Sequence, residues 1–313
     1  MKSYIPIGTR GSQLAMVQAE RVKTCIEKDF PMVAAKRIKI KTGGDMVRRG
    51  GIKPLESKRM FTREIEDALL KKEVDLAVHS AKDMAVLLPK GLKISAVLER
   101  EDPRDCLISQ EKKKLSELSE KARIGTSSLR RKKQLLRHHP ELAIEEVRGN
   151  VETRIRKVQE GQYDGVVLAY AGVKRLGLEN YVAEIFSEEK ILPAPGQGII
   201  AVESRVGDRD TDEILAPMNH EETMKQLTCE RAFLKRLEGG CQLPCGIKTT
   251  ISEGQIMAQG ALFSVEGSEC AEGRTEGASD NPGQIGEKLA NMILEKGGRE
   301  ILEKIRHEGR SKK

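Results

Sequence analysis

Aromatic side chains are scarce in this chain of 313 residues, and tryptophan is absent. Phe, Tyr and Trp together make up 3% of the residues, which leaves few flat rings on which the bases of a single-stranded nucleic acid could stack. The formal net charge of +7 would otherwise suggest a nucleic-acid partner. Because the basic residues are spread along the chain, we expect a compact acidic ligand and no nucleic acid.

Long apolar runs are missing as well. No stretch approaches the roughly 20 apolar residues that cross a bilayer, and residues 1–7 lack the apolar core of a signal peptide. We therefore expect a cytoplasmic protein with no membrane partner. A chain of 313 residues has room for two or three domains with cores of their own.

A paired cysteine framework is the third absence. The six cysteines are scattered along the chain, so we interpret them as reduced thiols. Cys241 and Cys245 lie close enough in sequence to share a zinc ion. Cys229 and His220 could complete such a site, but no second close pair of Cys or His is present, and we expect no metal. Cys241 stands out for another reason, since two glycines precede it and leave its sulfur accessible.

Short apolar runs alternate with helix-period stretches over the first two thirds of the chain. Strands are predicted at residues 5–8, 37–41, 75–79, 94–98, 106–109, 123–125, 144–147, 165–169 and 199–202. Helices are predicted at residues 14–27, 62–72, 129–137, 151–160 and 171–176. This alternation is typical of α/β domains with largely parallel sheets. Charged or proline-rich breaks at residues 99–104 and 192–198 interrupt it and indicate crossings between domains.

The pattern changes after about residue 217. A long helix is predicted at residues 221–237, and the Gly-Gly-Cys turn follows it. Short strands are then predicted at residues 247–251, 255–263 and 269–274, and helices at residues 286–296 and 299–306. These elements indicate a small C-terminal α+β domain with an antiparallel sheet.

The most informative junction of strand and helix is the run Gly-Thr-Ser-Ser-Leu-Arg-Arg at residues 125–131. Small hydroxyl residues cap the free N–H groups of a helix start, and the helix dipole favours an anion there. Arg130 and Arg131 add donors that suit a carboxylate or a phosphate. The run is equally compatible with an anion site and with an ordinary cap followed by exposed basic residues.

Two further junctions follow the same pattern. Arg148 and Gly149 come after the predicted strand at residues 144–147. Arg10 and Ser12 come after the first predicted strand. Because ligands of open α/β sheets bind at the carboxyl ends of the strands, these junctions predict an anion-lined cleft between two domains.

A fourth junction carries a carboxylate. Lys82 and Asp83 follow the predicted strand at residues 75–79. Asp83 among cations could hold N–H groups of a ligand or stabilise a developing positive charge. The alternative is a surface ion pair of Lys82 and Asp83, which would stabilise little. We interpret His79 as a core histidine or as a support for a site residue.

Taken together, ordered segments from about residue 5 to residue 308 resemble the porphobilinogen deaminase family, also called the hydroxymethylbilane synthases. The segments are Gly-Thr-Arg-x-Ser (8–12), Ala-Val-His-Ser-x-Lys-Asp (77–83), Glu-Asp-Pro-Arg-Asp (101–105), Gly-Thr-Ser-Ser-Leu-Arg-Arg (125–131), Arg-Gly-Asn-Val-x-Thr-Arg (148–154), Ala-Gly-x-Lys-Arg-Leu-Gly-Leu (171–178), Leu-Pro-Ala-Pro-Gly-Gln-Gly (192–198) and Leu-Glu-Gly-Gly-Cys-Gln (237–242).

The resemblance implies a transferase of tetrapyrrole, porphyrin and haem biosynthesis. Such an enzyme condenses four porphobilinogen molecules head to tail into linear hydroxymethylbilane and releases ammonia. The resemblance also implies a dipyrromethane cofactor joined by a thioether to Cys241, no metal, and a monomer. Each pyrrole carries an acetate and a propionate, so the growing chain is a polyanion, which explains the cationic junctions.

Site residues follow from the same resemblance, position by position. Asp83 corresponds to the family's catalytic aspartate. The implied cofactor-binding set is Cys241, Lys82, Asp83, Thr126, Ser127, Ser128, Arg130, Arg131, Arg148 and Gly149. The implied substrate-binding set is Arg10, Ser12, Arg148, Arg154, Arg175, Gln197, Lys58 and Phe61.

The resemblance implies a fold of two α/β domains, both of the type II periplasmic-binding-protein kind, and a small C-terminal α+β domain with an antiparallel sheet. The implied domains are residues 1–98 with 194–216, residues 99–193, and residues 217–313. The first domain is then discontinuous, and the third carries the cofactor cysteine.

The sequence departs from the family pattern in one loop. Ser57, Lys58 and Arg59 stand where the family has a glycine-rich stretch, which would restrict a lid loop. Lys53 lies beside a position where the family has a lysine. Two alternatives are compatible with the sequence: a family member with impaired turnover, and a non-catalytic small-anion-binding protein of the same two-domain architecture.

Overall fold

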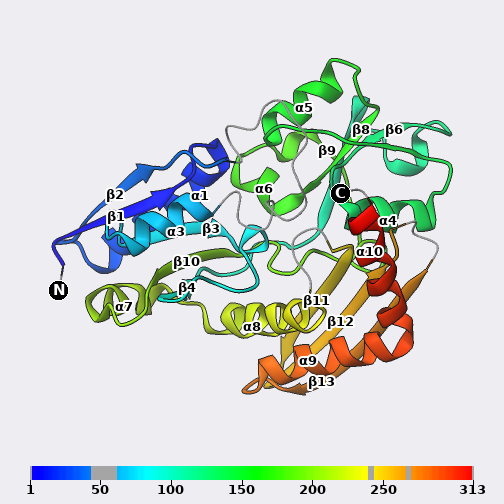
Figure 1. The fold of residues 1–313 in the computed structure, drawn as a ribbon. Coiled ribbons are helices and arrows are strands. Elements are labelled where there is room, and N and C mark those ends of the chain that lie inside the picture. Colours follow the sequence, from blue (N-terminus) through cyan, green and yellow to red (C-terminus); the bar gives the residue numbers. More distant parts are fainter. Residues whose placement is uncertain (1, 44–61, 239–242, 266–268, 312–313) are drawn as a thin grey trace. The chain divides into compact units, whose positions relative to one another are not determined.

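The computed structural model describes residues 2–43, 62–238, 243–265 and 269–311 (Figure 1). The loop residues Lys53, Lys58 and Phe61 and the expected cofactor cysteine Cys241 lie outside these ranges. The chain forms two compact units, Met1–Glu101 with Ile199–Leu227 and Asp102–Gly198 with Thr228–Lys313.

The first unit is built on a five-stranded sheet with the strand order β2-β1-β3-β10-β4. Its strands are β1 (Tyr4–Thr9), β2 (Ala34–Lys39), β3 (Leu76–Ser80), β4 (Leu92–Val97) and β10 (Ile200–Arg205). β1 is parallel to β2 and β3, whereas β10 is antiparallel to β3 and β4. Helices α1 (Gln13–Asp29), α3 (Arg63–Leu70) and α7 (Arg209–Leu215) lie beside this sheet (Figure 1).

The second unit holds a sheet of the same design, with the strand order β7-β6-β8-β5-β9. Its strands are β5 (Asp105–Ser109), β6 (Arg123–Gly125), β7 (Ala143–Glu145), β8 (Gly165–Ala169) and β9 (Val182–Ile185). β6 is parallel to β7 and β8, whereas β5 is antiparallel to β8 and β9. The helices are α4 (Leu129–His138), α5 (Val151–Gln159) and α6 (Tyr170–Arg175).

Strand β8 shows why this sheet lies inside its unit. Side chains alternate between the two faces of a strand, and Val166, Val167 and Leu168 are all buried. Val167 packs into one apolar cluster, while Val166 and Leu168 pack into a second cluster on the opposite face. A continuous apolar run such as this one is typical of a strand that is covered on both faces.

The second unit also contains a small antiparallel sheet with the strand order β11-β12-β13. Its strands are β11 (Cys245–Ser252), β12 (Gln255–Phe263) and β13 (Cys270–Ala278), and the helices beside it are α9 (Pro282–Ile293) and α10 (Arg299–Ser311) (Figure 1). Leu289 and Ile293 of α9 pack with Phe233, which lies on α8 (Glu221–Arg236). This core therefore joins α8, which precedes residues 239–242 in the chain, to the sheet and helix that follow them.

The fold class expected from the sequence is confirmed: two sheet-and-helix assemblies and a small antiparallel sheet. The expectation of largely parallel sheets is wrong, since each five-stranded sheet has two parallel and two antiparallel pairings. An apolar run does not encode the direction of its strand, and β5 and β10 each enter their sheet soon after the chain crosses from the other unit. Strand β9 and helix α7 were not predicted, and the three-domain boundaries stay a prediction.

No helix among the described residues is long and apolar enough to span a membrane.

A charged cluster lies at one edge of the first unit's sheet, where β1 and β3 begin and the antiparallel β10 ends. Lys2 Nζ lies 2.9 Å from an Asp208 oxygen and 3.0 Å from an Asp75 oxygen. Arg205 Nη2 binds both of these carboxylates, at 2.7 Å in the case of Asp208. Burial alone would raise the pKa of Asp208, but hydrogen bonds from Lys2, Thr211 and Arg205 lower it from 3.8 to about 2.

We expect Asp208→Asn to destabilise the protein at neutral pH by about 1–3 kcal/mol, because charge-assisted hydrogen bonds are lost. The folded pKa of Asp208 lies below the unfolded value, so this stability is complete above about pH 4 and is lost as pH falls towards 2. Urea unfolding between pH 7 and pH 3 should show the gap between the two proteins narrowing. Glu213→Gln, exposed on the same helix, is the control, and an equal gap at every pH would contradict the assignment.

Candidate functional site

One edge of the second unit's sheet collects several of the predicted site residues. Because β6, β7 and β8 are parallel, their carboxyl ends meet at the same edge. β5 is antiparallel to β8, which brings its amino end, Asp105, to this edge as well. The residues after Gly125 and Glu145 therefore lie beside the start of β5.

Hydroxyl groups organise the chain between β6 and α4. The Ser128 hydroxyl accepts a hydrogen bond from the N–H of Arg131 at 3.4 Å, which confirms Ser128 as the N-cap of α4. The Ser127 hydroxyl donates to the Val147 carbonyl at 2.5 Å. Buried Thr126 accepts from the N–H of Ser128 at 3.2 Å. This turn therefore has a fixed backbone with Ser127 exposed at its outer side.

Arg130 and Arg131 are buried, not exposed as in an ordinary basic helix start. Arg130 Nη1 lies 2.7 Å from one oxygen of Asp105, and Arg131 Nη2 lies 2.8 Å from the other. Gln197 Nε2 donates to Asp105 at 2.9 Å. Burial alone would raise the pKa of Asp105, but the charges and hydrogen bonds of the two arginines hold it far below its ordinary value.

Asp105 is the residue at this edge that the sequence did not single out. It belongs to the segment 101–105, one of those that carry the resemblance, but an acid next to Arg104 in a charged break of the chain gave no sign of its partners. One signal for such a partner was the excess of cations that the sequence predicts at this edge. If any of these arginines is buried, it needs a carboxylate nearby.

The junction after β7 carries a second cationic group. The Asn150 side chain caps α5 by accepting the Thr153 N–H at 2.9 Å. Gly149 has φ +118°, and a Cβ there would lie 2.6 Å from Thr153 Cγ2, so only glycine fits. Arg154 Nε donates to the Gly149 carbonyl at 2.8 Å. The Arg148 side chain is 59% exposed, and its Nε lies 2.9 Å from a Glu146 oxygen. An ion pair this exposed stabilises little, so the guanidinium group is available to a ligand.

Arg175 is the last residue of helix α6, which directly follows β8, and it is also buried. Its Nη2 donates to the Gly198 carbonyl at 2.5 Å. The neighbouring Gln197 binds the Pro103 carbonyl at 2.6 Å. The segment 192–198 thus lies against the same edge as Asp105.

In the first unit, the carboxyl ends of β1 and β3 bring the other predicted residues to one edge, because these strands are parallel. Ser12 is the N-cap of α1 and accepts from the Ala15 N–H at 3.3 Å. Arg10 lies between β1 and this cap. Lys82 and Asp83 lie in a 3₁₀ turn (Ala81–Asp83) directly after β3, and Asp83 is exposed. Both sheets therefore carry charged residues at the edge where their parallel strands end. That these residues line one common cleft stays a prediction.

His79 lies inside the first sheet. Its Nε2 is 3.2 Å from an oxygen of Glu203, and both residues are buried. His79 is thus a core histidine with a carboxylate partner, one of the two interpretations left open by the sequence.

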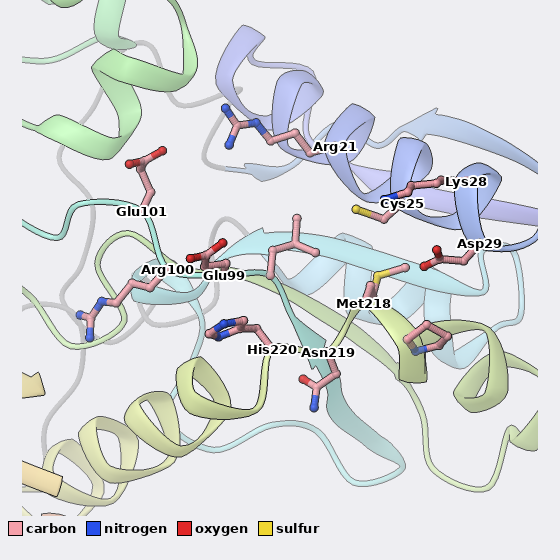
Figure 2. Close-up of a pocket in the computed structure, with 12 residues that line it drawn as sticks. Arg21, Cys25, Lys28, Asp29, Glu99, Arg100, Glu101, Met218, Asn219 and His220 are labelled. Carbon is pink, nitrogen blue, oxygen red and sulfur yellow. The ribbon is translucent and has the colours of Figure 1, made fainter. Parts of the chain in front are cut away.

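A pocket of about 630 Å³ lies elsewhere in the first unit (Figure 2). It is lined by Arg21, Cys25, Lys28 and Asp29 of α1, by residues 98–101 after β4, and by residues 217–220 before α8. None of the predicted site residues lines it. Because its lining mixes acids and bases, it indicates no single class of ligand.

Among the described residues, which do not include Cys241, no cluster of three or more His, Cys, Asp or Glu is suited to a metal. His220 instead accepts the Thr223 N–H through Nδ1 at 3.3 Å, at the start of α8. Cys229 and Cys245 are buried in the apolar core around Phe233.

Comparison with known proteins decides the family. Residues 5–213 match the family model described as porphobilinogen deaminase, dipyromethane cofactor binding domain, and residues 224–295 match the porphobilinogen deaminase C-terminal domain. The chain belongs to the porphobilinogen deaminase family. Porphobilinogen deaminase of Carboxydothermus hydrogenoformans is 44% identical over 308 residues, which cover 98% of this chain and 99% of that relative.

A second porphobilinogen deaminase, from Syntrophomonas wolfei, is 44% identical over 296 residues, covering 95% of this chain and 97% of that relative. Among solved structures, the BvgS periplasmic VFT2 domain of Bordetella pertussis is similar with a TM-score of 0.42 and 14% identity. That similarity covers 72% of this chain and 92% of the VFT2 domain.

The residues at the edge of the second unit fit the dipyrromethane group that the porphobilinogen deaminase family carries. A dipyrromethane bears carboxylates, and this edge offers guanidinium, hydroxyl and backbone N–H donors, which suit carboxylates. Arg130 Nε is buried and has no hydrogen-bond partner. An orphaned buried donor of this kind calls for an acceptor from outside the protein.

Proposed function

We propose that this protein condenses four porphobilinogen molecules into the linear tetrapyrrole hydroxymethylbilane and releases ammonia at each step. The observation that carries the proposal is membership of the porphobilinogen deaminase family over almost the whole chain, with Asp83 and the arginines at the strand ends. This is a transferase reaction of tetrapyrrole biosynthesis, and porphobilinogen is its substrate.

Cys241 is proposed to hold the dipyrromethane cofactor through a thioether. When bound, this group supplies the pyrrole carbon on which the product chain is built. The second unit's edge would hold its carboxylates through Arg130, Arg131 and Arg148, with donors from Thr126, Ser127, Ser128 and Gly149. Lys82 and Asp83 of the first unit are proposed as further cofactor-binding residues. The buried arginines are fixed in place before any ligand arrives, so little order has to be created on binding.

Asp83 is proposed as the catalytic residue. It is exposed at the end of β3, where its carboxylate can accept the N–H of a substrate pyrrole. As the C–N bond of the substrate breaks and ammonia leaves, positive charge develops on that pyrrole, and a fixed carboxylate stabilises it. After the new C–C bond forms, Asp83 can accept the proton that the acceptor carbon loses.

Substrate carboxylates are proposed to bind Arg10, Ser12, Arg148, Arg154, Arg175 and Gln197, with Lys58 and Phe61 from the loop that lies outside the described residues. Arg154 and Arg175 each donate to a backbone carbonyl, which fixes the direction of their guanidinium groups. We further propose a cytoplasmic monomer with no nucleic-acid or membrane partner.

Arg148→Leu tests the exposed cation at the second unit's edge. Its side chain is 59% exposed and pairs with the equally exposed carboxylate of Glu146, so the variant should fold normally. Losing one charge-assisted contact with an anionic ligand should raise the KM for porphobilinogen by roughly 10- to 100-fold. Steady-state kinetics measures this, with the nearby exposed Arg156→Leu as control, and an unchanged KM would show that Arg148 is structural.

Turnover of porphobilinogen tests the function itself. Purified protein should release one ammonia per porphobilinogen consumed and form a linear tetrapyrrole. Binding of porphobilinogen without ammonia release would favour the non-catalytic anion-binding protein, and slow release would favour impaired turnover through the Ser57–Arg59 loop.

A further inference from the structure

Asp105 is fully buried at the start of β5, and its carboxylate accepts hydrogen bonds from Arg130, Arg131 and Gln197. Arg130 Nη1 donates to Oδ2 at 2.7 Å, while Arg131 Nε and Nη2 donate to Oδ1 at 3.0 and 2.8 Å. Gln197 Nε2 donates to Oδ1 at 2.9 Å. One carboxylate thus holds two guanidinium groups in place.

The position of this carboxylate is itself fixed from several sides. Asp105 pairs with Ala169 across the sheet, and its carbonyl accepts the Phe186 N–H at 3.0 Å. Gln197 also binds the Pro103 carbonyl at 2.6 Å, so it cannot follow Asp105 if the side chain rotates. These contacts hold Asp105 in one position, and Asp105 in turn fixes the two arginines at the start of α4.

Each arginine is oriented by Asp105 and by one backbone carbonyl. Arg130 Nη1 donates to the Leu192 carbonyl at 2.6 Å, and Arg131 Nη1 donates to the Val167 carbonyl at 3.0 Å. Two acceptors for each arginine restrict the orientation of its guanidinium group. The Nε edge of Arg130 is left without a partner.

The charges of this cluster do not balance. Two buried guanidinium groups face one carboxylate, which leaves one surplus positive charge where an unpaired charge is costly. A ligand carboxylate supplies the missing negative charge. Without Asp105 the surplus would double, and the like charges of Arg130 and Arg131 would repel each other.

We propose that Asp105 is a positioning residue, which holds Arg130 and Arg131 in the arrangement that takes a carboxylate of the dipyrromethane and of the pyrrole chain built on it. This inference rests on the proposed function. Asp105 is not a proton donor or acceptor in the reaction, because its burial behind the arginines keeps it from the reacting atoms. Its effect reaches the ligand only through Arg130 and Arg131.

Asp105→Asn tests the inference, since it keeps the shape of the side chain and removes its charge. We expect the folded variant to gain the covalent cofactor mass at least 10-fold more slowly than the unaltered protein when apo-protein is incubated with porphobilinogen. Intact-mass spectrometry follows the gain, and circular dichroism and Tm report the fold. In the loaded fraction, KM should rise more than kcat falls, because carboxylate binding and not the chemical step is impaired.

Two core variants on the same strand separate positioning from general destabilisation. Ile108→Val and Leu107→Ala remove buried apolar volume from β5 without touching either arginine. A core variant whose Tm falls as much as that of Asp105→Asn should still load the cofactor at the rate of the unaltered protein. Equal slowing in a Tm-matched core variant would overturn the inference.

The outcomes separate the inference from the function on which it rests. If the unaltered protein gains no cofactor mass, the proposed function fails. If the unaltered protein loads and a folded Asp105→Asn loads equally fast, the inference alone fails. Should Asp105→Asn not fold, Gln197→Met removes a neutral donor from Asp105 and leaves all three charges, and it should slow loading about 3- to 10-fold. Loading at the unaltered rate by Gln197→Met would then overturn the inference.

Discussion

An Asp83→Asn variant is expected to turn over porphobilinogen at least about 100-fold more slowly than the unaltered protein, because the charge that stabilises the developing pyrrole cation is lost. Asn keeps the size of the side chain and can still accept one N–H. Asp83 is exposed at the end of its turn, so folding should be unaffected. The variant should still acquire its cofactor, since the carboxylate-binding arginines are unchanged.

Single-turnover ammonia release, with intact mass and Tm measured on the same preparation, checks this expectation. Glu73→Gln is a matched control, because Glu73 is an exposed carboxylate just before β3, at the opposite end of that strand. Turnover within about threefold of the unaltered rate would remove Asp83 from the catalytic role, since a general base or charge stabiliser contributes far more than that.

Gly286→Ala is expected to prevent stable folding of the part of the chain that follows Cys241. A Cβ at this position of α9 would overlap the carbonyl oxygen of Cys229 and lie 2.9 Å from the backbone nitrogen of Phe233. Both contacts are with the backbone of α8, so no side chain can move aside. The helices would have to separate, which opens the core around Phe233 and costs roughly 3–5 kcal/mol.

Urea or thermal unfolding measures the effect. Gly283→Ala lies on the same helix and has nothing within 4 Å of its added Cβ, so it should leave stability unchanged or raise it by about 0.5–1 kcal/mol through helix propensity. A Gly286→Ala protein that is as stable as Gly283→Ala would contradict the close packing of α8 against α9.

The junctions of strand and helix were the part of the site that the sequence could predict. Ser128 caps its helix as expected, and Ser12 and Asn150 cap theirs at the two junctions of the same pattern, because a cap depends on residues within four positions of one another. The parallel pairing of neighbouring strands then brought these junctions to common edges. Local chemistry and one general rule of sheet topology were enough for this step.

The state of Arg130 and Arg131 could not be predicted. A run of basic residues after a cap suggests a solvated helix face, yet both guanidinium groups are buried against Asp105. Their burial depends on β5 entering the sheet antiparallel to β8, so that its first residue reaches the same edge. That pairing joins residues far apart in the chain, and no local pattern encodes it.

The mixed direction of the sheets escaped prediction for the same reason. β10 returns to the first unit after the whole of the five-stranded sheet of the second, and it lies between β3 and β4. Its apolar run is the same whether the strand lies parallel or antiparallel to its neighbours. Direction is decided by where the connection enters, which is a property of the fold.

The covalent attachment of the cofactor to Cys241 is the central claim, and intact-mass spectrometry after exposure to porphobilinogen tests it most directly. We predict a gain equal to two deaminated pyrrole units, located on the peptide that contains Cys241 and absent from a Cys241→Ser variant. An unmodified mass for the unaltered protein, or a gain of the same size in Cys241→Ser, would contradict the claim.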